Sequence, residues 1–367
     1  MNPEELTLGI EEEYQIIDPH TRELTSYVSE FLEKGRMVFR DQVKPEFLQS
    51  QIEIGSKVCR DISEARQEVS RLRRMVCEIG DKSGHKIVAA GTHPFSRWQE
   101  QDITEKDRYR SLVADLQYIA RRLLVFGTHI HVAVPNRELR IDVMNQVCYF
   151  LPHILALSTS SPFWLGENTG LKSYRSVVFA DLPRTGLPEP FDSADEYEHY
   201  VQTLVHTGCI DEPTKIWWDV RPHPRFPTLE FRICDCVTTI DEVMAIAALI
   251  QAVVAKLIQL RRKNQSWRTY RHMLIAENKW RSIKDGLDGK LVDFGKDEEV
   301  PVRTLIEELL EIIDDVVEPL GIRREIDYIE TMLEIGTSAD RQLKIFTETG
   351  SVEAVVDHLA VETVAGC

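Results

Sequence analysis

The sequence predicts an α+β protein in which one curved, mainly antiparallel sheet carries the functional site and helices cover that sheet. Three observations lead to this fold class. Short segments with strand patterns are followed by long segments with helical periodicity. The connections between the first strands are short enough to allow antiparallel pairing. Polar residues also gather on one face of several predicted strands.

The first ninety residues predict two facing strands, a helix and a return strand. Segment 6–17, LTLGIEEEYQII, is rich in β-forming residues, and segment 47–58, FLQSQIEIGSKV, alternates polar and apolar positions. A helix begins near Asp61, and residues 86–91 form the next strand. The apolar face of this helix repeats at spacings of three and four residues, at Ile62, Ala65, Val69, Leu72, Val76 and Ile79.

The middle of the chain repeats this alternation of strands and helices. A helix is expected at 118–124, followed by the strand VFGTHIHVAV and an apolar helix at 141–158. Two capping boxes open further helices, one formed by Ser193 with Glu196 and one by Thr239 with Glu242. The strand PTLEFRICD lies between those helices, and the segment 161–176, SPFWLGENTGLKSYRS, reads as a turn-rich loop.

From Pro301 onward the chain is helical and acidic, with a break at 319–321. No repeat, low-complexity tract or linker divides the sequence. We therefore expect residues 1–367 to form a single domain, with 301–367 as a helical tail that packs on the back of the sheet.

Composition excludes several classes of protein. Sixty acidic residues against 44 basic ones give a net charge of -16, which would repel a phosphate backbone, so no nucleic-acid partner is expected. The start of the chain has no basic and apolar leader pattern, and the uncharged run 243–255 is too short to cross a bilayer. Seven cysteines without a CxxC pair indicate reduced, mostly buried thiols. A soluble cytoplasmic protein with no membrane partner is expected.

The sharpest local feature is the triplet Glu11-Glu12-Glu13 inside a β-like segment. Alternation places Glu11 and Glu13 on one face and Glu12 on the other. Two carboxylates about 7 Å apart on one face repel each other unless a cation or water separates them. The triplet alone is therefore compatible with a cation site or with a solvated strand face.

Three more segments add polar groups to predicted strand faces. These groups are Glu46, Gln49, Gln51 and Glu53 in the second strand, His129 and His131 in GTHIHV, and Glu230 and Arg232 in LEFRICD. Mg²⁺ prefers oxygen ligands, so Glu11, Glu13, Glu53 and Glu230, with His129 completing one site, suit Mg-ATP. Arg175, Arg221, Arg225 and Arg232 lie close to these segments and could neutralise phosphate. No GxxxxGK[ST] loop is present.

Two other readings stay open at this point. An HxH pair on a strand is typical of some zinc hydrolases, in which His129 and His131 would bind the metal. Such a site needs further histidines at strand ends, whereas His153 and His206 fall in helical patterns. A non-catalytic binding protein that keeps the same fold is the third reading.

Seven motifs in order resemble the glutamate–cysteine ligase type 2 family of carboxylate–amine ligases. They are GIEEEYQIIDP, FLQSQIEIG, AAGTHPF, GTHIHV, GENTGLKSYRS, LEFRICD and ENKWRSIKDGLDG. The resemblance covers about residues 6–295. It implies a glutamine-synthetase-like curved sheet and use of ATP with Mg²⁺ or Mn²⁺.

The resemblance also implies roles for individual residues. Glu11, Glu13, Glu53, His129 and Glu230 would bind metal, and Arg232 would meet the phosphate of ATP. Gln49 and Glu46 would line the metal or amine side, and Tyr174 and Arg175 would hold substrate. The implied reaction joins glutamate to cysteine through an acyl phosphate, with Glu46 as the candidate base for the amine. The amine and the oligomeric state stay open, with a homodimer among the options.

Overall fold

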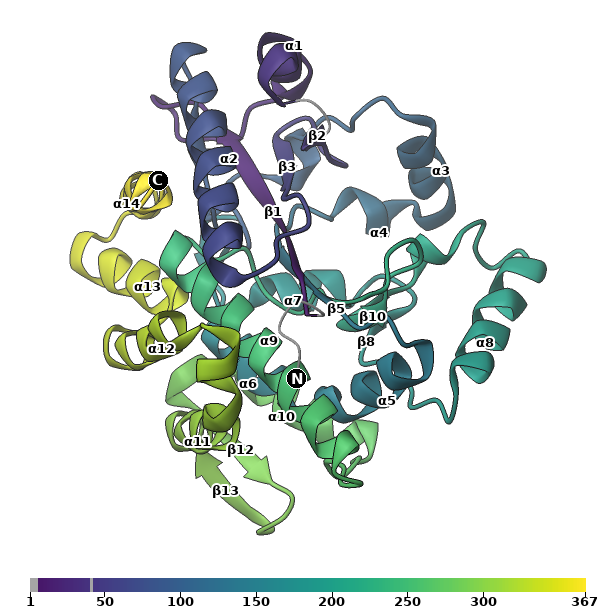
Figure 1. Ribbon diagram of the computed structural model, residues 1–367. Helices are drawn as coiled ribbons and strands as arrows, with labels where there is room; N and C mark the ends of the chain where they lie inside the picture. Colours follow the sequence, from purple (N-terminus) through teal and green to yellow (C-terminus); the bar gives the residue numbers. More distant parts are fainter. Residues whose placement is uncertain (1–5, 40–41) are drawn as a thin grey trace.

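A computed structural model describes residues 6–39 and 42–367 of the chain. Its main sheet has seven strands, with β1 (Leu8–Ile17) in the centre (Figure 1). The strand order is β10-β11-β5-β1-β3-β2, and β4 pairs with the C-terminal end of β1. These strands are β2 (Val43–Pro45), β3 (Gln51–Gly55), β4 (Lys86–Val88), β5 (Thr128–Ala133), β10 (Val220–Pro222) and β11 (Thr228–Phe231). All these pairings are antiparallel, which confirms the predicted α+β class.

The register of this sheet brings the polar side chains of several strands to one face, which we call the front face. Glu11 of β1 stands opposite His129 of β5, and Glu13 of β1 stands opposite Glu53 of β3. Glu230 of β11 continues this row on the far side of β5. Because residues that face each other in an antiparallel pair share one face, the front face collects these groups.

Four helices cover the opposite, back face. The predicted amphipathic helix is α2 (Ile62–Lys82), whose first turn is capped by the side chain of Asp61 at the amide of Glu64. It packs on β1 and β4, while α9 (Ile240–Arg262) packs on β5. Helix α5 (Arg137–Val147) packs on β10 and β11, and α14 (Val352–Val364) packs on β4.

Of the C-terminal helices, α14 contacts the sheet, and two others pack against α9. Helices α11 (Val302–Leu320) and α12 (Arg323–Ile335) pack against α9 rather than directly on the strands they were expected to cover. Helix α13 (Ser338–Thr349) packs against α14. The left-handed Gly321 ends α11, near the predicted break. Helices α11 and α12 therefore form a second layer behind α9 (Figure 1).

Helix α9 is the central buried helix of the protein. Its capping box of Thr239 and Glu242 is present as predicted. Among the described residues, it is the one helix that is long and apolar enough to cross a membrane, and 83% of its apolar window is buried inside the protein. The uncharged run 243–255 is thus part of a longer apolar helix, so the length argument from sequence was wrong. Its burial identifies it as a core helix.

Charge inside α9 is expected to be costly. Ile246 is 1% exposed and lies in the main apolar cluster. We expect Ile246→Asp to lower the free energy of unfolding by about 3 kcal/mol or more, because it buries an unpaired carboxylate. Urea unfolding followed by circular dichroism measures this change. Ile246→Val is the matched control, with an expected loss of about 0.5–1.5 kcal/mol. Equal midpoints for the two variants would contradict the burial of this position.

Several elements differ from the sequence-based expectation. The apolar helix at 141–158 is broken into α5 and α6 (Leu151–Leu157) by a 3₁₀ turn, with Pro152 in the first turn of α6. At Ser193 only half of the capping box forms, because the Glu196 carboxylate accepts from the amide of Asp192. Four α-helices in the described part of the chain were not predicted, namely α1 (Val28–Phe39), α3 (Asp107–Leu116), α7 (Tyr174–Phe179) and α10 (His272–Asp285). Of these, α7 begins inside the segment 161–176 that was expected to be a loop. The remaining elements are α4 (Tyr118–Arg121), α8 (Ala194–His206), β6 (Phe163–Trp164), β7 (Glu167–Asn168), β8 (Thr185–Gly186), β9 (Trp217–Trp218), β12 (Lys290–Asp293) and β13 (Glu298–Pro301).

Candidate active site

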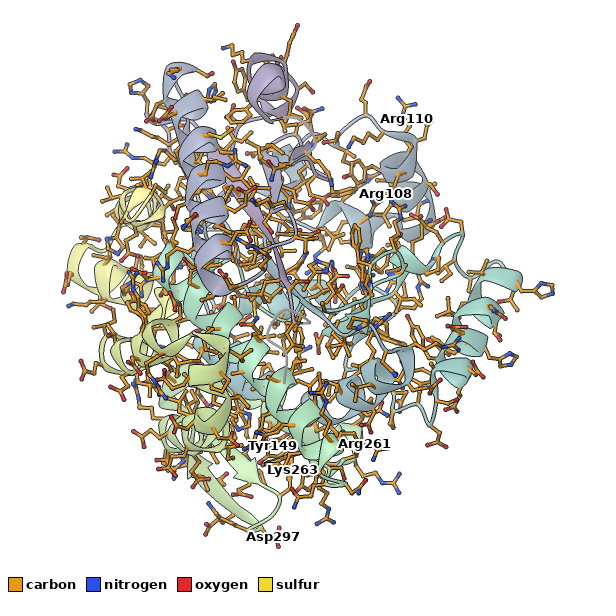
Figure 2. The ribbon with its side chains drawn as sticks, viewed as in Figure 1. Arg108, Arg110, Tyr149, Arg261, Lys263 and Asp297 are labelled. Carbon is orange, nitrogen blue, oxygen red and sulfur yellow. The ribbon has the colours of Figure 1, made fainter. Side chains whose placement is uncertain are left out.

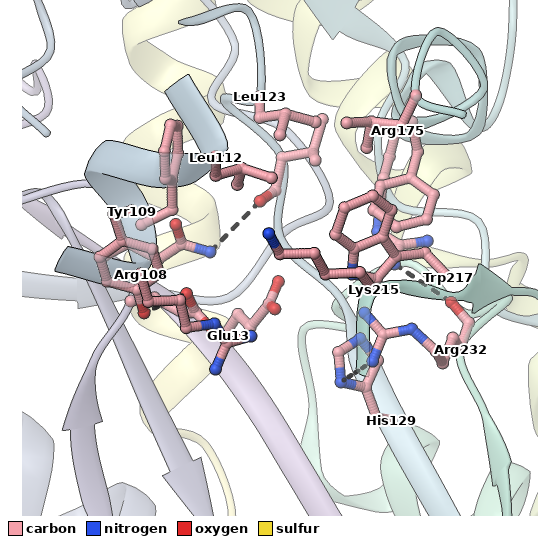
Figure 3. Close-up of a pocket in the computed structure, with 16 residues that line it drawn as sticks. Glu13, Arg108, Tyr109, Leu112, Leu123, His129, Arg175, Lys215, Trp217 and Arg232 are labelled. Carbon is pink, nitrogen blue, oxygen red and sulfur yellow. Dashed lines mark hydrogen bonds between the residues drawn. The ribbon is translucent and has the colours of Figure 1, made fainter. Parts of the chain in front are cut away.

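Two adjoining cavities lie over the front face of the sheet. The smaller, of about 120 Å³, extends toward α3 and α7 and is shown in Figure 3. The larger, of about 290 Å³, extends over β11 and the loop before it. Both cavities are lined by Glu13, Glu46, Arg108, Tyr109, His129, Trp217 and Arg232. A ligand in one cavity would therefore meet a ligand in the other at these shared residues.

Glu11, His131 and Glu230 form the first group of candidate metal ligands. One ligand atom from each lies within 4.8 Å of the others. Nε2 of His131 is 3.6 Å from Oε1 of Glu11, is buried, and has no hydrogen-bond partner among the described residues. Nδ1 of His129 lies 3.3 Å from the other oxygen of Glu11. An unpartnered imidazole nitrogen between two carboxylates fits a divalent cation.

Glu13, Glu46 and Glu53 form the second group, again with ligand atoms within 4.8 Å of one another. Burial and the neighbouring Glu46 raise the pKa of Glu13 to about 7. Burial, with the charges of Glu11, Glu46 and Glu13, raises the pKa of Glu53 well above its usual value. Three carboxylates this close destabilise one another, so a bound cation would relieve the repulsion.

Arginines supply the positive charge beside these groups. Arg232 donates to Oε1 of Glu230 at 2.5 Å, and Arg221 donates to Oε2 of Glu230 at 2.8 Å. The two guanidinium groups hold the pKa of Glu230 well below its usual value despite its burial. Nε of Arg232 is buried without a partner among the described residues, so this N–H group can donate to a ligand.

Arg175 is locked against the strand that carries Arg232. Its Nη2 donates to the carbonyl of Arg232 at 3.1 Å, and its Nη1 donates to the carbonyl of Ile233 at 3.4 Å. A side chain at Gly127 would lie 2.5 Å from Nη2 of Arg175, so this glycine allows the close approach. Backbone carbonyls therefore occupy the fork of Arg175, and its buried Nε lacks a partner in the described part of the chain.

Asp235 anchors the loop that carries Arg175. This fully buried carboxylate accepts from the Ser160 amide at 2.9 Å, from Oγ of Ser161 at 2.7 Å and from Oγ of Ser173 at 2.8 Å. The turn-rich loop at 161–176 is thereby tied to the end of β11. This bonding fixes the start of α7, the helix that carries Arg175, beside the cavity.

Glu12 belongs to the back face and to the structural core. It forms a fully buried ion pair with Arg73 of α2, and it accepts a hydrogen bond from Oη of Tyr14 at 2.5 Å. Arg73 also donates to the carbonyls of Thr238 at 2.6 Å and Thr363 at 3.3 Å. The middle residue of the triplet thus holds β1 against α2, the segment before α9, and α14.

Comparison of the chain with known proteins identifies its family. The family model for glutamate–cysteine ligase family 2 matches residues 7–358. The chain belongs to this family. A relative from Chloroflexus aurantiacus, provisionally named glutamate–cysteine ligase 2, is 55% identical over 98% of this chain and 92% of its own length. A relative of the same provisional name from Roseiflexus castenholzii is 53% identical over 98% of this chain and 95% of its own.

Solved structures agree with the fold. A glutamate–cysteine ligase from Francisella tularensis in complex with AMP has a TM-score of 0.72 at 13% identity, covering 98% of this chain and 89% of that one. A bifunctional glutathione synthetase from Pasteurella multocida has a TM-score of 0.71 at 14% identity, covering 99% of this chain and 53% of that one. Membership of glutamate–cysteine ligase family 2 supports an ATP-dependent ligase. The comparisons give no support to the zinc-hydrolase alternative.

The fold of glutamate–cysteine ligase family 2 brings most of the predicted site residues together here. They are Glu11, Glu13, Glu46, Glu53, His129, Arg175, Glu230 and Arg232. Gln49 and Tyr174 do not line either cavity. Gln49 precedes β3, so strand alternation does not apply to it, and its Oε1 accepts from Oγ of Ser29 at 3.1 Å. Tyr174 begins α7 and packs against Trp164, with ring centroids 5.5 Å apart.

Sequence reasoning missed several residues that line the cavities. They include Arg108, Tyr109, Lys215 and Trp217. The first two belong to α3, which was not predicted, and the other two lie in a short segment before β10. The one available signal was the basic cluster at 106–110 in an otherwise acidic chain.

Proposed function

We propose that this member of glutamate–cysteine ligase family 2 is a Mg-ATP-dependent carboxylate–amine ligase that forms an amide through an acyl phosphate. The observation that carries the proposal is the two groups of candidate metal ligands beside the cavities, with arginines next to them. Glu11 and Glu230 line the larger cavity, and Glu13 and Glu46 lie at its junction with the smaller one. Phosphoryl transfer depends mainly on positioning and on neutralising charge, and this junction offers both.

The larger cavity suits the triphosphate of ATP. Its lining includes six basic side chains, namely Lys44, Lys106, Arg108, Arg221, Arg225 and Arg232. In a protein with a net charge of -16, such a local cluster is what attracts an anion. Glu11 and Glu230 with the two flanking imidazoles would hold a cation at one site, and Glu13, Glu46 and Glu53 would hold a cation at a second site. Bound Mg²⁺ would supply positive charge that neutralises the phosphate.

The smaller cavity suits an amino acid with a short methylene chain. Leu112, Leu123 and Val125 provide an apolar wall, and Arg175 and Lys215 provide positive charge. Glutamate fits this lining, because its methylene groups can contact the wall while its side-chain carboxylate reaches the junction. The α-carboxylate would meet Nε of Arg175, since the fork of that residue is occupied by backbone carbonyls.

The chemistry then proceeds in two steps. A glutamate carboxylate oxygen attacks the γ-phosphorus of ATP, and ADP leaves with the electron pair of the broken bond. The amine next attacks the acyl carbon, phosphate leaves, and Glu46 accepts the proton that the amine loses. Glu46 lines both cavities, and Oη of Tyr109 orients it at 2.9 Å. Cysteine is the proposed amine, and the product is then γ-glutamylcysteine. We also propose that the enzyme is cytoplasmic and that residues 1–367 form one catalytic domain.

A screen for ADP release tests this function. Purified protein is expected to release ADP with glutamate and cysteine only when Mg²⁺ or Mn²⁺ is present, because the carboxylate groups need a cation to accept phosphate. EDTA is expected to abolish release, and added Mg²⁺ to restore it. Panels of other amines and acids provide the comparison. A different productive pair would keep the ligase class and reject the named substrates, while metal-independent ADP release would contradict the mechanism.

A further inference from the structure

Arg108 has a position that the reaction described so far does not use. It lies in the first turn of α3 and lines both cavities. Only one other arginine among the described residues, Arg232, lines both. Figure 3 shows Arg108 reaching from α3 toward the side of the cavity where Glu13 lies, whereas Arg232 lies across the cavity beside His129. The junction is thus bordered by two guanidinium groups from different elements.

Helix α3 is fastened beside the second carboxylate group. Oη of Tyr109 donates to Oε2 of Glu46 at 2.9 Å and to the carbonyl of Pro45 at 3.3 Å. The Tyr109 ring also meets Phe47 edge to face, with centroids 5.7 Å apart. Tyr109 is 5% exposed, so these contacts are enclosed. The residue next to Arg108 therefore fixes where its side chain starts relative to Glu46.

The two arginines at the junction differ in their bonding. Arg232 is already paired with Glu230 and contacts His129. The guanidinium of Arg108 lies 5.8 Å from the ring centroid of Tyr109, and it makes no ion pair or hydrogen bond with any residue in 6–39 or 42–367. Arg108 therefore offers a complete donor fork at the junction, whereas Nη1 of Arg232 is already engaged by Glu230 and His129.

We propose that Arg108 is a second catalytic arginine, which binds the transferring phosphoryl group from the α3 side, opposite Arg232. This inference rests on the proposed ligase function. As the carboxylate oxygen bonds to the γ-phosphorus and the bond to the leaving oxygen of ADP breaks, negative charge spreads over the three equatorial oxygens. The N–H groups of Arg108 donate to these oxygens, and no proton is transferred to or from the arginine.

Variants of two neighbouring arginines test the proposal by steady-state ADP release. Arg108→Ala is expected to lower kcat by about 10²-fold or more with a small change in KM for ATP, because the contact forms in the transition state. Arg108→Lys keeps the charge without the fork and is expected to recover only part of kcat. Arg110→Ala is the matched control, since its side chain is 65% exposed on the same helix and lines neither cavity (Figure 2).

A binding measurement that needs no turnover separates this proposal from the proposed function. Titration calorimetry measures the binding of Mg-ADP with and without aluminium fluoride, which mimics the phosphoryl group during transfer. In the wild type and in Arg110→Ala, Mg-ADP is expected to bind more tightly when aluminium fluoride is present. Arg108→Ala is expected to lose that gain. The role of Arg108 would be overturned if the wild type is active and both alanine variants have the same kcat. It would also be overturned if Arg108→Ala raises only the KM for the acid. A wild type that neither binds Mg-ATP nor releases ADP would reject the proposed function, and the role of Arg108 with it.

Discussion

Glu53→Gln is expected to abolish Mg-dependent ADP release and at the same time to stabilise the metal-free protein. Glu53 is surrounded by the carboxylates of Glu11, Glu13 and Glu46, which raise its pKa together with burial. Replacing its carboxylate by a neutral amide removes repulsion that no cation offsets in the metal-free state. Each unit by which the pKa of Glu53 is raised corresponds to about 1.4 kcal/mol of destabilisation of the ionised carboxylate. The amide also removes one candidate ligand, so activity is expected to fall at least about 10²-fold.

Two thermal unfolding curves, with EDTA and with Mg²⁺, measure this effect. In EDTA the glutamine variant is expected to melt a few degrees above the wild type. Mg²⁺ is expected to raise the melting temperature of the wild type, since a ligand that binds the folded state stabilises it, and to change the variant less. Glu330→Gln, at an exposed position on α12, is the control and should match the wild type in both conditions. A variant that is less stable than the wild type in EDTA, or that retains full Mg-dependent turnover, would reject the cation site.

Arg73→Met is expected to cause the largest loss of stability among the variants considered. Arg73 and Glu12 both have fully buried side chains, so removing the arginine leaves a carboxylate uncompensated in the core. Breaking such a pair from one side costs about 3–5 kcal/mol. The double variant Glu12→Gln with Arg73→Met removes both charges and is expected to recover part of that loss. Urea unfolding of the two variants measures the difference.

Arg74→Met is the matched control for this pair. Arg74 is the next residue of α2 and is exposed, so its replacement is expected to change the free energy of unfolding by no more than about 0.5 kcal/mol. If Arg73→Met unfolds at the same urea concentration as Arg74→Met, the buried pair contributes nothing to stability. If the double variant is no more stable than Arg73→Met alone, the loss comes from packing and not from the charge left behind.

Much of the fold could be predicted because its elements have regular sequence patterns. Alternation in segment 6–17, the helical period after Asp61 and the capping box at Thr239 each describe local backbone preferences. The break between α5 and α6 could not be seen, since both halves are apolar and the helical period continues through the 3₁₀ turn. The second layer formed by α11 and α12 depends on which surface of α9 they meet, and periodicity does not specify that partner.

The same difference holds for the candidate site: residues on regular strands could be predicted, and residues placed by tertiary contacts could not. Strand alternation was enough to predict that Glu11 and Glu13 share one face, and the register of β1 and β3 places Glu53 on that face. Gln49 was misplaced because β3 begins two residues later than the polar pattern suggests. Arg108 lies at the junction because the hydrogen bond from Tyr109 to Glu46 holds α3 there. This is a tertiary contact, and no pattern in the local sequence predicts it.

The bonding of Thr363 has a practical consequence for handling the protein. Thr363 lies in the last turn of α14, where its carbonyl accepts from Arg73 and its hydroxyl accepts from the amide of Ala89 at 3.0 Å. Arg73 in turn holds Glu12, whose neighbours along β1 face the cavities. Fusion partners and affinity tags attached close behind this turn would disturb a segment that is linked through Arg73 and Glu12 to β1, the strand that carries Glu11 and Glu13. A purification handle on this side therefore belongs behind a long flexible spacer.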